Sequence, residues 1–382
     1  MSLKKFSNLI RTKEEWKQIA DSTADLRGKV IQNIDFTNVE TDWERFRVKG
    51  ANFLACDFLK EDAVYLIREG AVVYPKFSKF PYNPHRIDLY SWQELMGEDC
   101  ERFQDSTDLK IYNHFIRTKY NPPMDEAMAQ RLHDYAIDVA LRNIIEYDER
   151  GMTKKKIVGF MGGHATRRGS EYYIKVALAA KRLTSKGYYV ATGGGPGIME
   201  AANLGAYFGN YSDEDLMNAI SILSDLQFEG DDLRDYYAVN YFQQAKKVLE
   251  LYPVGMENLA IPTWFYGHEP SNLFANYIAK YFSNSIREDT LLAICLYGIV
   301  YAPGSAGTTQ EIFQEAAQNH YGTFGYYSPM IFLGKKRYIE DTALYSVLHQ
   351  LAVGMPYKEL LYLTDDPELA VDFIENHPPV KV

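Results

Sequence analysis

The residues that decide the fold are 297–311, with the sequence YGIVYAPGSAGTTQE. The apolar run 299–302 is short and bounded by glycine and proline, which predicts a buried strand. The chain then breaks at Pro303-Gly304, passes small residues, and takes up a helical pattern from Glu311. Small residues let backbone N–H groups approach a ligand, and a helix N-terminus carries partial positive charge. The stretch therefore predicts a strand, a phosphate-binding turn and a helix.

The same stretch also allows a purely structural interpretation. Thr308 and Glu311 are spaced as in a capping box, in which each side chain satisfies a backbone N–H of the other. A second glycine turn, GGGPGIME at 193–200, follows another predicted strand at 188–192. Ligands of open parallel sheets bind beyond the carboxyl ends of the strands, so two such turns favour a ligand site.

Composition excludes several classes of protein. The chain has 382 residues, 46% hydrophobic and 24% charged, which is typical of a globular protein of one large or two ordinary domains. Its net charge of −10 and the lack of a basic stripe disfavour a nucleic-acid partner. The 3 cysteines lie far apart, so neither a disulfide framework nor a metal site is expected. Without a signal peptide or a long apolar span in the sequence, we expect a cytoplasmic protein and no membrane partner.

The pattern of elements changes near residue 150. Residues 1–150 combine short strand-like pieces with a long helix from about 124 to 146, which predicts a smaller mixed α+β region of unknown role. From residue 156 strands and helices alternate, so we predict for 151–382 a Rossmann-like open parallel sheet with helices on both faces. Within it we expect an acidic helical insertion at 210–255, a helix around 272–279 and a strand near 280–282.

Two common nucleotide-binding motifs are absent from the sequence. The first strand of the predicted sheet, 157–161, ends in Gly-Gly-His, and the second runs directly into the triple glycine. A dinucleotide fingerprint needs G-x-G-x-x-G after the first strand and an acidic residue after the second, so NAD binding is disfavoured. Neither turn continues into Gly-Lys-Ser/Thr, which excludes a P-loop.

The two turns resemble the motifs of a known family. GGGPGIME at 193–200 and PGSAGTTQE at 303–311 are similar to the paired GGG-x-x-x-M and PGG-x-GT-x-x-E motifs of the Lonely Guy family of phosphoribohydrolases. GGH at 162–164 and EPSN at 269–272 resemble the larger bacterial nucleotide 5′-monophosphate nucleosidases of that family. The resemblance spans roughly residues 155–335. It implies hydrolysis of a nucleoside 5′-monophosphate to free base and ribose 5-phosphate, and we expect neither a metal nor a cofactor.

The resemblance also implies roles for individual residues. Glu311 would contact the ribose and stabilise positive charge at C1′, and Arg287, one residue from the family's register, would assist it. The 5′-phosphate would be held by Gly304, Ser305, Gly307 and Thr308, with Ser305 in place of the family's usual glycine. The remaining residues expected to bind the nucleotide are Gly162, Gly163, His164, Gly193, Gly194, Gly195, Gly197, Glu200, Glu269 and Asn272.

Several of these residues have simpler alternatives. His164 would either contact or protonate the base, or serve as an ordinary turn histidine. His268 and Glu269 would either line the same cleft or end a strand. Glu200 would complement a helix dipole in any case. Two other classes of function also remain open: a nucleotide-binding sensor without hydrolysis, and a molybdenum-cofactor carrier-like protein.

The resemblance and the composition bear on assembly and on the insertion. Relatives form dimers or larger oligomers, and 30 Tyr and 20 Phe suit a large interface, so we expect a homo-oligomer, a dimer or a tetramer. The insertion 210–255 is either a solvated helical decoration or a lid. As a lid, it would stack Tyr236, Tyr237, Tyr241 and Phe242 on the base.

Overall fold

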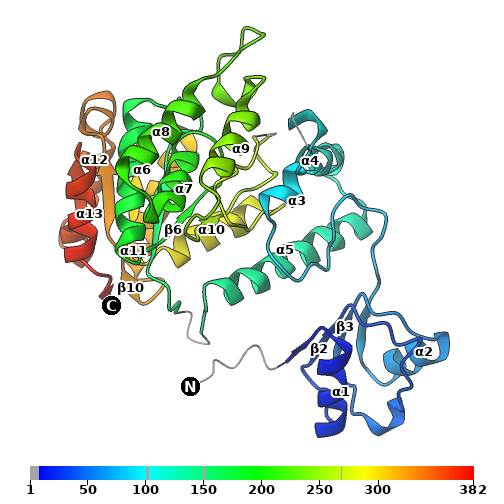
Figure 1. Ribbon diagram of the computed structural model, residues 1–382. Helices are drawn as coiled ribbons and strands as arrows, with labels where there is room; N and C mark the ends of the chain where they lie inside the picture. The colour runs from blue at the N-terminus through cyan, green and yellow to red at the C-terminus, as the bar shows by residue number, and fades with distance from the viewer. Residues whose placement is uncertain (1–7, 100–102, 149–151, 268) are drawn as a thin grey trace. The chain divides into compact units, whose positions relative to one another are not determined.

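The computed structural model describes residues 8–99, 103–148, 152–267 and 269–382. The chain forms two compact units, one of residues 1–87 with 122–139 and one of residues 88–121 with 140–382 (Figure 1). The boundary expected at residue 150 falls among residues 149–151, which lie outside the described residues, and so stays a prediction.

The first unit is built on a parallel sheet of 4 short strands in the order β1-β2-β3-β4. The register pairs Leu9 with Val30, Val30 with Asn52 and Asn52 with Val72, so successive coils of the chain stack on one another. Aromatic side chains pack together in the core of this unit. Trp16 and Trp43 each lie edge to face against Phe36, and their own two rings are tilted relative to each other. The elements are β1 (Leu9–Ile10), α1 (Lys13–Ser22), β2 (Val30–Gln32), β3 (Asn52–Leu54), α2 (Lys60–Arg68) and β4 (Val72–Tyr74).

The second unit carries the large sheet. Its helices are α3 (Trp92–Met96), α4 (Thr107–Thr118), α6 (Glu171–Ser185), α7 (Ile198–Tyr207), α8 (Asp213–Ser224), α9 (Tyr241–Leu251), α10 (Asn284–Ile294), α11 (Ala306–Tyr321), α12 (Leu344–Leu351) and α13 (Pro367–Asn376), and α5 (Met124–Ile144) is shared between the units. Its main strands are β5 (Ile157–Met161), β6 (Tyr189–Thr192), β7 (Leu259–Ala260), β8 (Tyr277–Ile278), β9 (Ile299–Tyr301), β11 (Met330–Leu333) and β12 (Leu361–Thr364). A small antiparallel pair joins β10 (Tyr326–Tyr327) to β13 (Val380–Lys381). No helix among the described residues combines the length and the apolar character needed to cross a bilayer.

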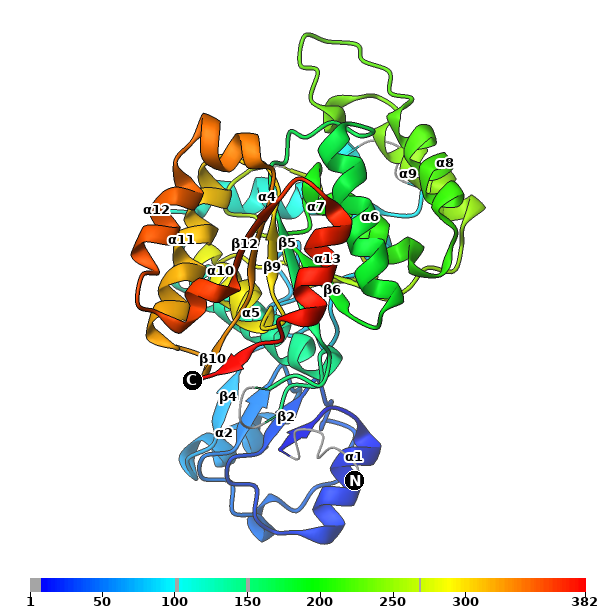
Figure 2. The ribbon, with the colours of Figure 1, turned by 90° about the vertical axis from the view of Figure 1, so that its left-hand side faces the viewer.

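The large sheet has 7 strands in the order β12-β11-β9-β5-β6-β7-β8, and every pairing is parallel. The chain runs outward from β5 to β8, returns to β9 on the other side of β5, and continues to β12. Helices cover both faces, with α6, α7 and α13 on one and α10, α11 and α12 on the other (Figure 2). The predicted Rossmann-like open α/β fold is confirmed. The strand order reverses between β5 and β9, and ligands of such folds bind in the crevice at this point.

The insertion 210–255 is part of the core of this unit. Apolar side chains of α8 and α9, among them Leu216, Ile220, Leu223 and Val248, belong to the same buried cluster as the strands of the sheet. The interpretation of the segment as a solvated decoration is therefore wrong, because a decoration would not bury an apolar face in the main core. Its interpretation as a lid stays a prediction.

The helix expected around 272–279 is absent. The backbone N–H of Asn272 donates to Gly194 O at 2.9 Å, and the Asn258 side chain donates to Phe274 O at 3.0 Å. These tertiary hydrogen bonds use backbone groups that a helix would need for itself. The strand β8 forms instead at Tyr277–Ile278, and within the expected strand 280–282 Tyr281 makes only an isolated bridge to Thr263.

Candidate active site

Three turns meet where the strand order reverses. They follow β5 (Gly162–His164), β9 (Pro303–Thr308) and β6 (Gly193–Gly197). The Gly163 N–H donates to Pro303 O at 3.0 Å, and Gly163 O accepts from the Ile198 N–H at 3.1 Å. The glycine-rich stretches singled out in the sequence therefore form one contiguous surface at the carboxyl edge of the sheet.

Close backbone approach explains two of the glycines. Gly197 has a φ of +70°, and a Cβ there would lie 2.4 Å from Gly163 O. A Cβ at Gly304 would lie 2.1 Å from the Thr308 hydroxyl oxygen and 3.1 Å from Gly163 N. Any side chain at either position would push the turns apart, so both must be glycine for the turns to meet.

The start of α11 is open to a ligand. The helix begins at Ala306 with Ser305 as N-cap, and the Ser305 side chain makes no capping hydrogen bond. The capping-box interpretation of Thr308 and Glu311 is wrong, because Thr308 lies inside the first turn. The N–H groups of a first helical turn have no acceptor within the helix. A Cβ at Gly307 would meet no atom within 4 Å, so an anion has room to approach these N–H groups.

Serine is tolerated where the family usually has glycine. Ser305 has a φ of −109°, outside the left-handed region that favours glycine, and its side chain is exposed. Its hydroxyl lies at the same helix start as the buried Thr308. The substitution therefore adds a possible hydrogen-bond donor and no strain at φ.

Glu311 and Arg287, predicted from distant parts of the sequence, form a buried pair. Each is 8% exposed, and Arg287 Nη1 lies 3.5 Å from Glu311 Oε1. Burial raises the pKa of Glu311 to about 7, Arg287 opposes that rise, and the neighbouring Glu288 carboxylate adds to it. Near neutral pH the Glu311 carboxyl therefore exists in both protonation states, as suits a group that takes up or releases a proton.

The position of the Arg287 guanidinium is fixed from three sides. Its Nε donates to Ile261 O, just beyond β7, at 2.9 Å. A Cβ at Gly193 would lie 2.9 Å from Arg287 Nη2, so the absence of a side chain there lets the guanidinium lie against the turn. The third side is the Glu311 carboxylate. Arg287 thus links the triple-glycine turn to α11.

Glu288 is a further member of this cluster that sequence reasoning missed. Its carboxylate is 5% exposed, lies 3.8 Å from Arg287 Nη1, and accepts from Gln310 Nε2 at 2.6 Å and from the Tyr266 hydroxyl at 3.4 Å. The sequence signal that could have found it is its position next to a candidate residue: Glu288 follows Arg287, and its partner Gln310 precedes Glu311. Nothing else in the sequence of this helix indicates that Glu288 is buried.

His164 and Glu269 lie together on the accessible side of the turns. His164 Nδ1 is 3.6 Å from Glu269 Oε1, and the two side chains are 38% and 39% exposed. A Cβ at Gly195 would lie 3.7 Å from Glu269 Oε2, so this pair borders the triple-glycine turn. His268, also considered for this cleft, lies outside the described residues.

Asn272 holds the triple-glycine turn in place. Its side-chain amide donates to Gly194 O at 3.1 Å and to Asn203 Oδ1 at 2.8 Å, and the residue is 1% exposed. Gly194 in turn donates to the Thr192 hydroxyl at 2.9 Å and has a φ of +74°. Gly162 is also closely packed, since a Cβ there would lie 2.6 Å from Ile198 Cγ2. These contacts favour a positioning role over direct ligand contact.

Glu200 and Tyr241 belong to a buried structural network. Glu200 is 1% exposed and pairs with Arg168 through Oε1 at 2.5 Å and Oε2 at 2.8 Å. The hydroxyls of Tyr173 and Tyr241 donate to the same carboxylate at 3.0 and 2.9 Å. With both oxygens occupied, we assign Glu200 to the scaffold. The Tyr241 ring also lies 3.7 Å from the Arg168 guanidinium, so the expectation that Tyr241 stacks on a base is wrong.

The arrangement brings three groups together. The first is the start of α11, where an anion can bind and which is called the anion seat below. The others are the buried pair Glu311–Arg287 and the more exposed pair His164–Glu269. Within the described residues, no group of three or more His, Cys, Asp and Glu side chains is arranged to hold a metal ion.

Comparison with known proteins finds solved structures that are similar to this chain at a low level. No protein-family model and no curated protein sequence matches the chain. The molybdenum cofactor carrier protein of Chlamydomonas reinhardtii aligns with 58% of this chain and 97% of its own, at 14% identity and a TM-score of 0.36. The molybdenum cofactor binding protein of Rippkaea orientalis gives the same four values. At this similarity the match says nothing about what this chain binds.

Proposed function

We propose that the chain hydrolyses the N-glycosidic bond of nucleoside 5′-monophosphates, as a phosphoribohydrolase of the Lonely Guy family. The observation that carries the proposal is the buried Glu311–Arg287 pair, which lies one helical turn beyond the anion-accessible start of α11. A protein that only binds a phosphate has no need of a buried carboxylate paired with an arginine beside that helix start.

The phosphate end of the substrate would occupy the start of α11. The backbone N–H groups of Gly307 and Thr308, together with the helix dipole, favour a dianion there. The hydroxyls of Ser305 and Thr308 supply two further donors. Hydrogen bonds to a dianion are charge-assisted, so this seat discriminates a nucleotide from its nucleoside.

The glycosidic end would face Glu311. As the C1′–N bond breaks, positive charge develops at C1′, and the ionised Glu311 carboxylate stabilises it. A water oxygen bonds to C1′, and Glu311 accepts the proton that this water loses. Arg287 holds the carboxylate in place and favours its ionised form.

The leaving base must take up a proton when it departs. His164 in its protonated form would donate that proton to a ring nitrogen, and Glu269, 3.6 Å away, would stabilise the imidazolium. The products are the free base and ribose 5-phosphate. As part of the same proposal, the protein works as a homo-oligomer, a dimer or a tetramer.

A product assay tests the proposal. The protein is incubated with AMP, GMP, CMP, UMP and IMP and with the matching nucleosides, and free base and ribose 5-phosphate are measured. We expect equal amounts of both products from at least one nucleotide, with EDTA present, and little product from its nucleoside. Tight nucleotide binding without release of base would contradict hydrolysis and favour a sensor or a cofactor carrier-like protein.

A further inference from the structure

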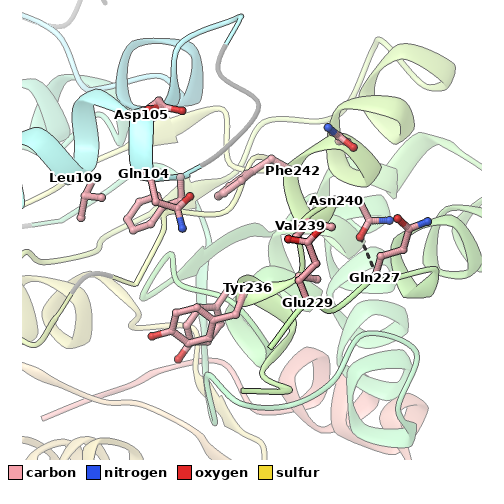
Figure 3. Close-up of a pocket in the computed structure, with 13 residues that line it drawn as sticks. Gln104, Asp105, Leu109, Gln227, Glu229, Tyr236, Val239, Asn240 and Phe242 are labelled. Atoms are coloured by element: carbon pink, nitrogen blue, oxygen red, sulfur yellow. Dashed lines mark hydrogen bonds between the residues drawn. The ribbon is translucent and has the colours of Figure 1, made fainter. Parts of the chain in front are cut away.

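Asp108 is a buried carboxylate outside the part of the chain that resembles a known family. It belongs to the first turn of α4 and is 1% exposed. Nearby residues of the same segment, among them Gln104, Asp105 and Leu109, line a cavity of about 810 Å³ (Figure 3). An acidic residue that only complements the dipole of α4 could face that cavity as well. Because a buried charge is costly unless it is paired, the position of Asp108 inside the core requires partners.

Both oxygens of this carboxylate accept hydrogen bonds from buried donors. Lys280 Nζ donates to Oδ2 at 2.8 Å, and Trp264 Nε1 donates to Oδ1 at 2.7 Å. Lys280 and Trp264 are buried as well, and all three residues belong to the second unit. Lys280 follows β8 and Trp264 follows β7, so these bonds join α4 to the chain beyond these two strands.

Lys280 also contacts a segment of the candidate active site. Its Nζ donates to Ser271 Oγ at 3.1 Å, and Ser271 is buried. Ser271 lies between Glu269 and Asn272 in the chain. Glu269 is the partner of His164, and Asn272 holds the triple-glycine turn. The Lys280 ammonium therefore anchors the middle of a segment whose two ends both contribute to the site.

This ion pair suits positioning better than stability alone. A buried pair of charges often stabilises a fold no more than apolar side chains of the same volume. The Asp108 carboxylate does, however, fix where the Lys280 ammonium lies, and a fixed ammonium directs its remaining N–H groups at defined atoms. Pro270 stands between Glu269 and Ser271 and restricts the backbone there, so a shift at Ser271 is passed on to Glu269.

We propose that Asp108 and Lys280 are a positioning pair for the candidate active site. Through Ser271 they hold the segment 269–272 against the triple-glycine turn, and neither residue touches the substrate. The pair makes α4, which belongs to the region 1–150 of unknown role, a part of the scaffold of the site. Its effect on base release rests on the proposed function, whereas its effect on the segment does not.

Three variants of the full-length protein separate positioning from stability. Lys280→Met keeps the length of the side chain but leaves the Asp108 carboxylate buried without its cation, so the protein should lose stability. Asp108→Asn combined with Lys280→Met removes both charges with little change of volume, so stability should return toward that of the wild type. Ser271→Ala keeps the ion pair and removes only the hydroxyl that accepts from Lys280.

Hydrogen–deuterium exchange followed by mass spectrometry measures how firmly the segment is held. The Asn272 N–H donates to Gly194 O at 2.9 Å, so the amide hydrogens of residues 271–274 report on the contact with the triple-glycine turn. We expect the double variant and Ser271→Ala to exchange there several-fold faster than the wild type. A pair that serves stability alone predicts wild-type exchange in the double variant.

The kinetics of base release give a second measure. In the double variant and in Ser271→Ala we expect kcat to fall about tenfold or more, because a small misplacement of an active-site group costs much of the rate. KM should stay close to the wild-type value, since the phosphate binds at the anion seat. Thermal unfolding checks that the double variant is folded, so that a lower kcat does not come from an unfolded fraction.

Lys181→Met is the matched control. Lys181 is also a buried lysine, and it pairs with Asp213 at 2.9 Å, between helices α6 and α8. The same substitution there should leave both the exchange of residues 271–274 and kcat unchanged. The inference is overturned if the double variant exchanges at 271–274 like the wild type, or if, with an active wild type, it releases base at the wild-type rate.

The two measurements also separate this inference from the proposed function. If the wild-type protein releases no base from any nucleotide, the proposed function fails, and the exchange of residues 271–274 alone decides the inference. Faster exchange in the double variant and in Ser271→Ala then supports the positioning pair, and wild-type exchange overturns it.

Discussion

The turns at residues 193–197 and 303–308 have similar compositions and different surroundings. A Cβ at Gly193, Gly194 or Gly195 would meet a neighbouring atom at 2.7 to 2.9 Å, whereas a Cβ at Gly307 would meet nothing within 4 Å. The first turn uses its glycines to pack against Met199, Ala260 and the Arg287 guanidinium. The second also packs closely at Gly304, but at Gly307 it keeps backbone N–H groups accessible. A glycine-rich turn can therefore position a site or contact the ligand, and the surrounding atoms decide which.

The largest effect on stability is expected in the packed turn. Gly197→Ala places a Cβ against two backbone oxygens, those of Gly163 and His164, at a φ of +70°. We expect the free energy of unfolding to fall by about 3 kcal/mol or more in urea denaturation. Gly187→Ala is the control, since Gly187 has a φ of +85° and open space around it. It should lose only about 1 to 2 kcal/mol, the cost of the left-handed conformation. Equal losses would contradict the packing argument.

A pH-dependent effect on stability is expected at Glu315, which lies one turn beyond Glu311 on α11. Glu315 is 3% exposed, and burial raises its pKa from 4.5 to about 7. Between these two pH values the unfolded chain has released this proton and the folded chain keeps it, so stability falls as the pH rises. Glu315→Gln removes this dependence. The unfolding free energy of the variant relative to wild type should therefore rise by about 1 to 3 kcal/mol between pH 5 and pH 8. A difference that is independent of pH would show that the carboxyl is not protonated in the folded state.

A smaller effect is expected on the pH profile of activity. The Glu288 carboxylate raises the pKa of Glu311, so Glu288→Gln should shift the acidic limb of kcat/KM to lower pH, by about 0.5 to 1 unit. Asp289→Asn removes the same charge from the next residue, which is exposed and bonded to Gln314. That variant should keep the wild-type profile. A shift of the same size in both would point to a general effect of net charge.

The smallest effect on stability is expected in the open turn. Gly307→Ala adds a methyl group where there is space, so the free energy of unfolding should change by less than about 0.5 kcal/mol. The same methyl group shields the first-turn N–H groups, and AMP binding measured by calorimetry should weaken several-fold. Unchanged AMP affinity would remove Gly307 from the anion seat.

The sequence predicted the sheet and its turns because their signals are local. Strands buried on both faces are continuous apolar runs, as in Ile157–Met161, and glycine and proline mark their ends. The convergence of Glu311 and Arg287 followed only from a family resemblance, since no local pattern links two residues on different helices. The roles of Glu200 and Tyr241 could not be foreseen, because an acidic residue early in a helix looks the same whether it faces solvent or a buried arginine. The prediction of a helix at 272–279 was wrong because side chains distant in sequence form hydrogen bonds with the backbone groups of this segment.

The most direct test of the central claim compares two glutamates on one helix. Glu311 and Glu315 are both buried, both have a pKa raised to about 7, and lie one turn apart, but only Glu311 contacts Arg287. Release of free base from the preferred nucleoside monophosphate is measured for Glu311→Gln and Glu315→Gln at the same pH. We predict that Glu311→Gln lowers kcat by about a hundredfold to a thousandfold while nucleotide still binds, and that Glu315→Gln stays close to wild type. Release of base by Glu311→Gln at the wild-type rate would contradict the account.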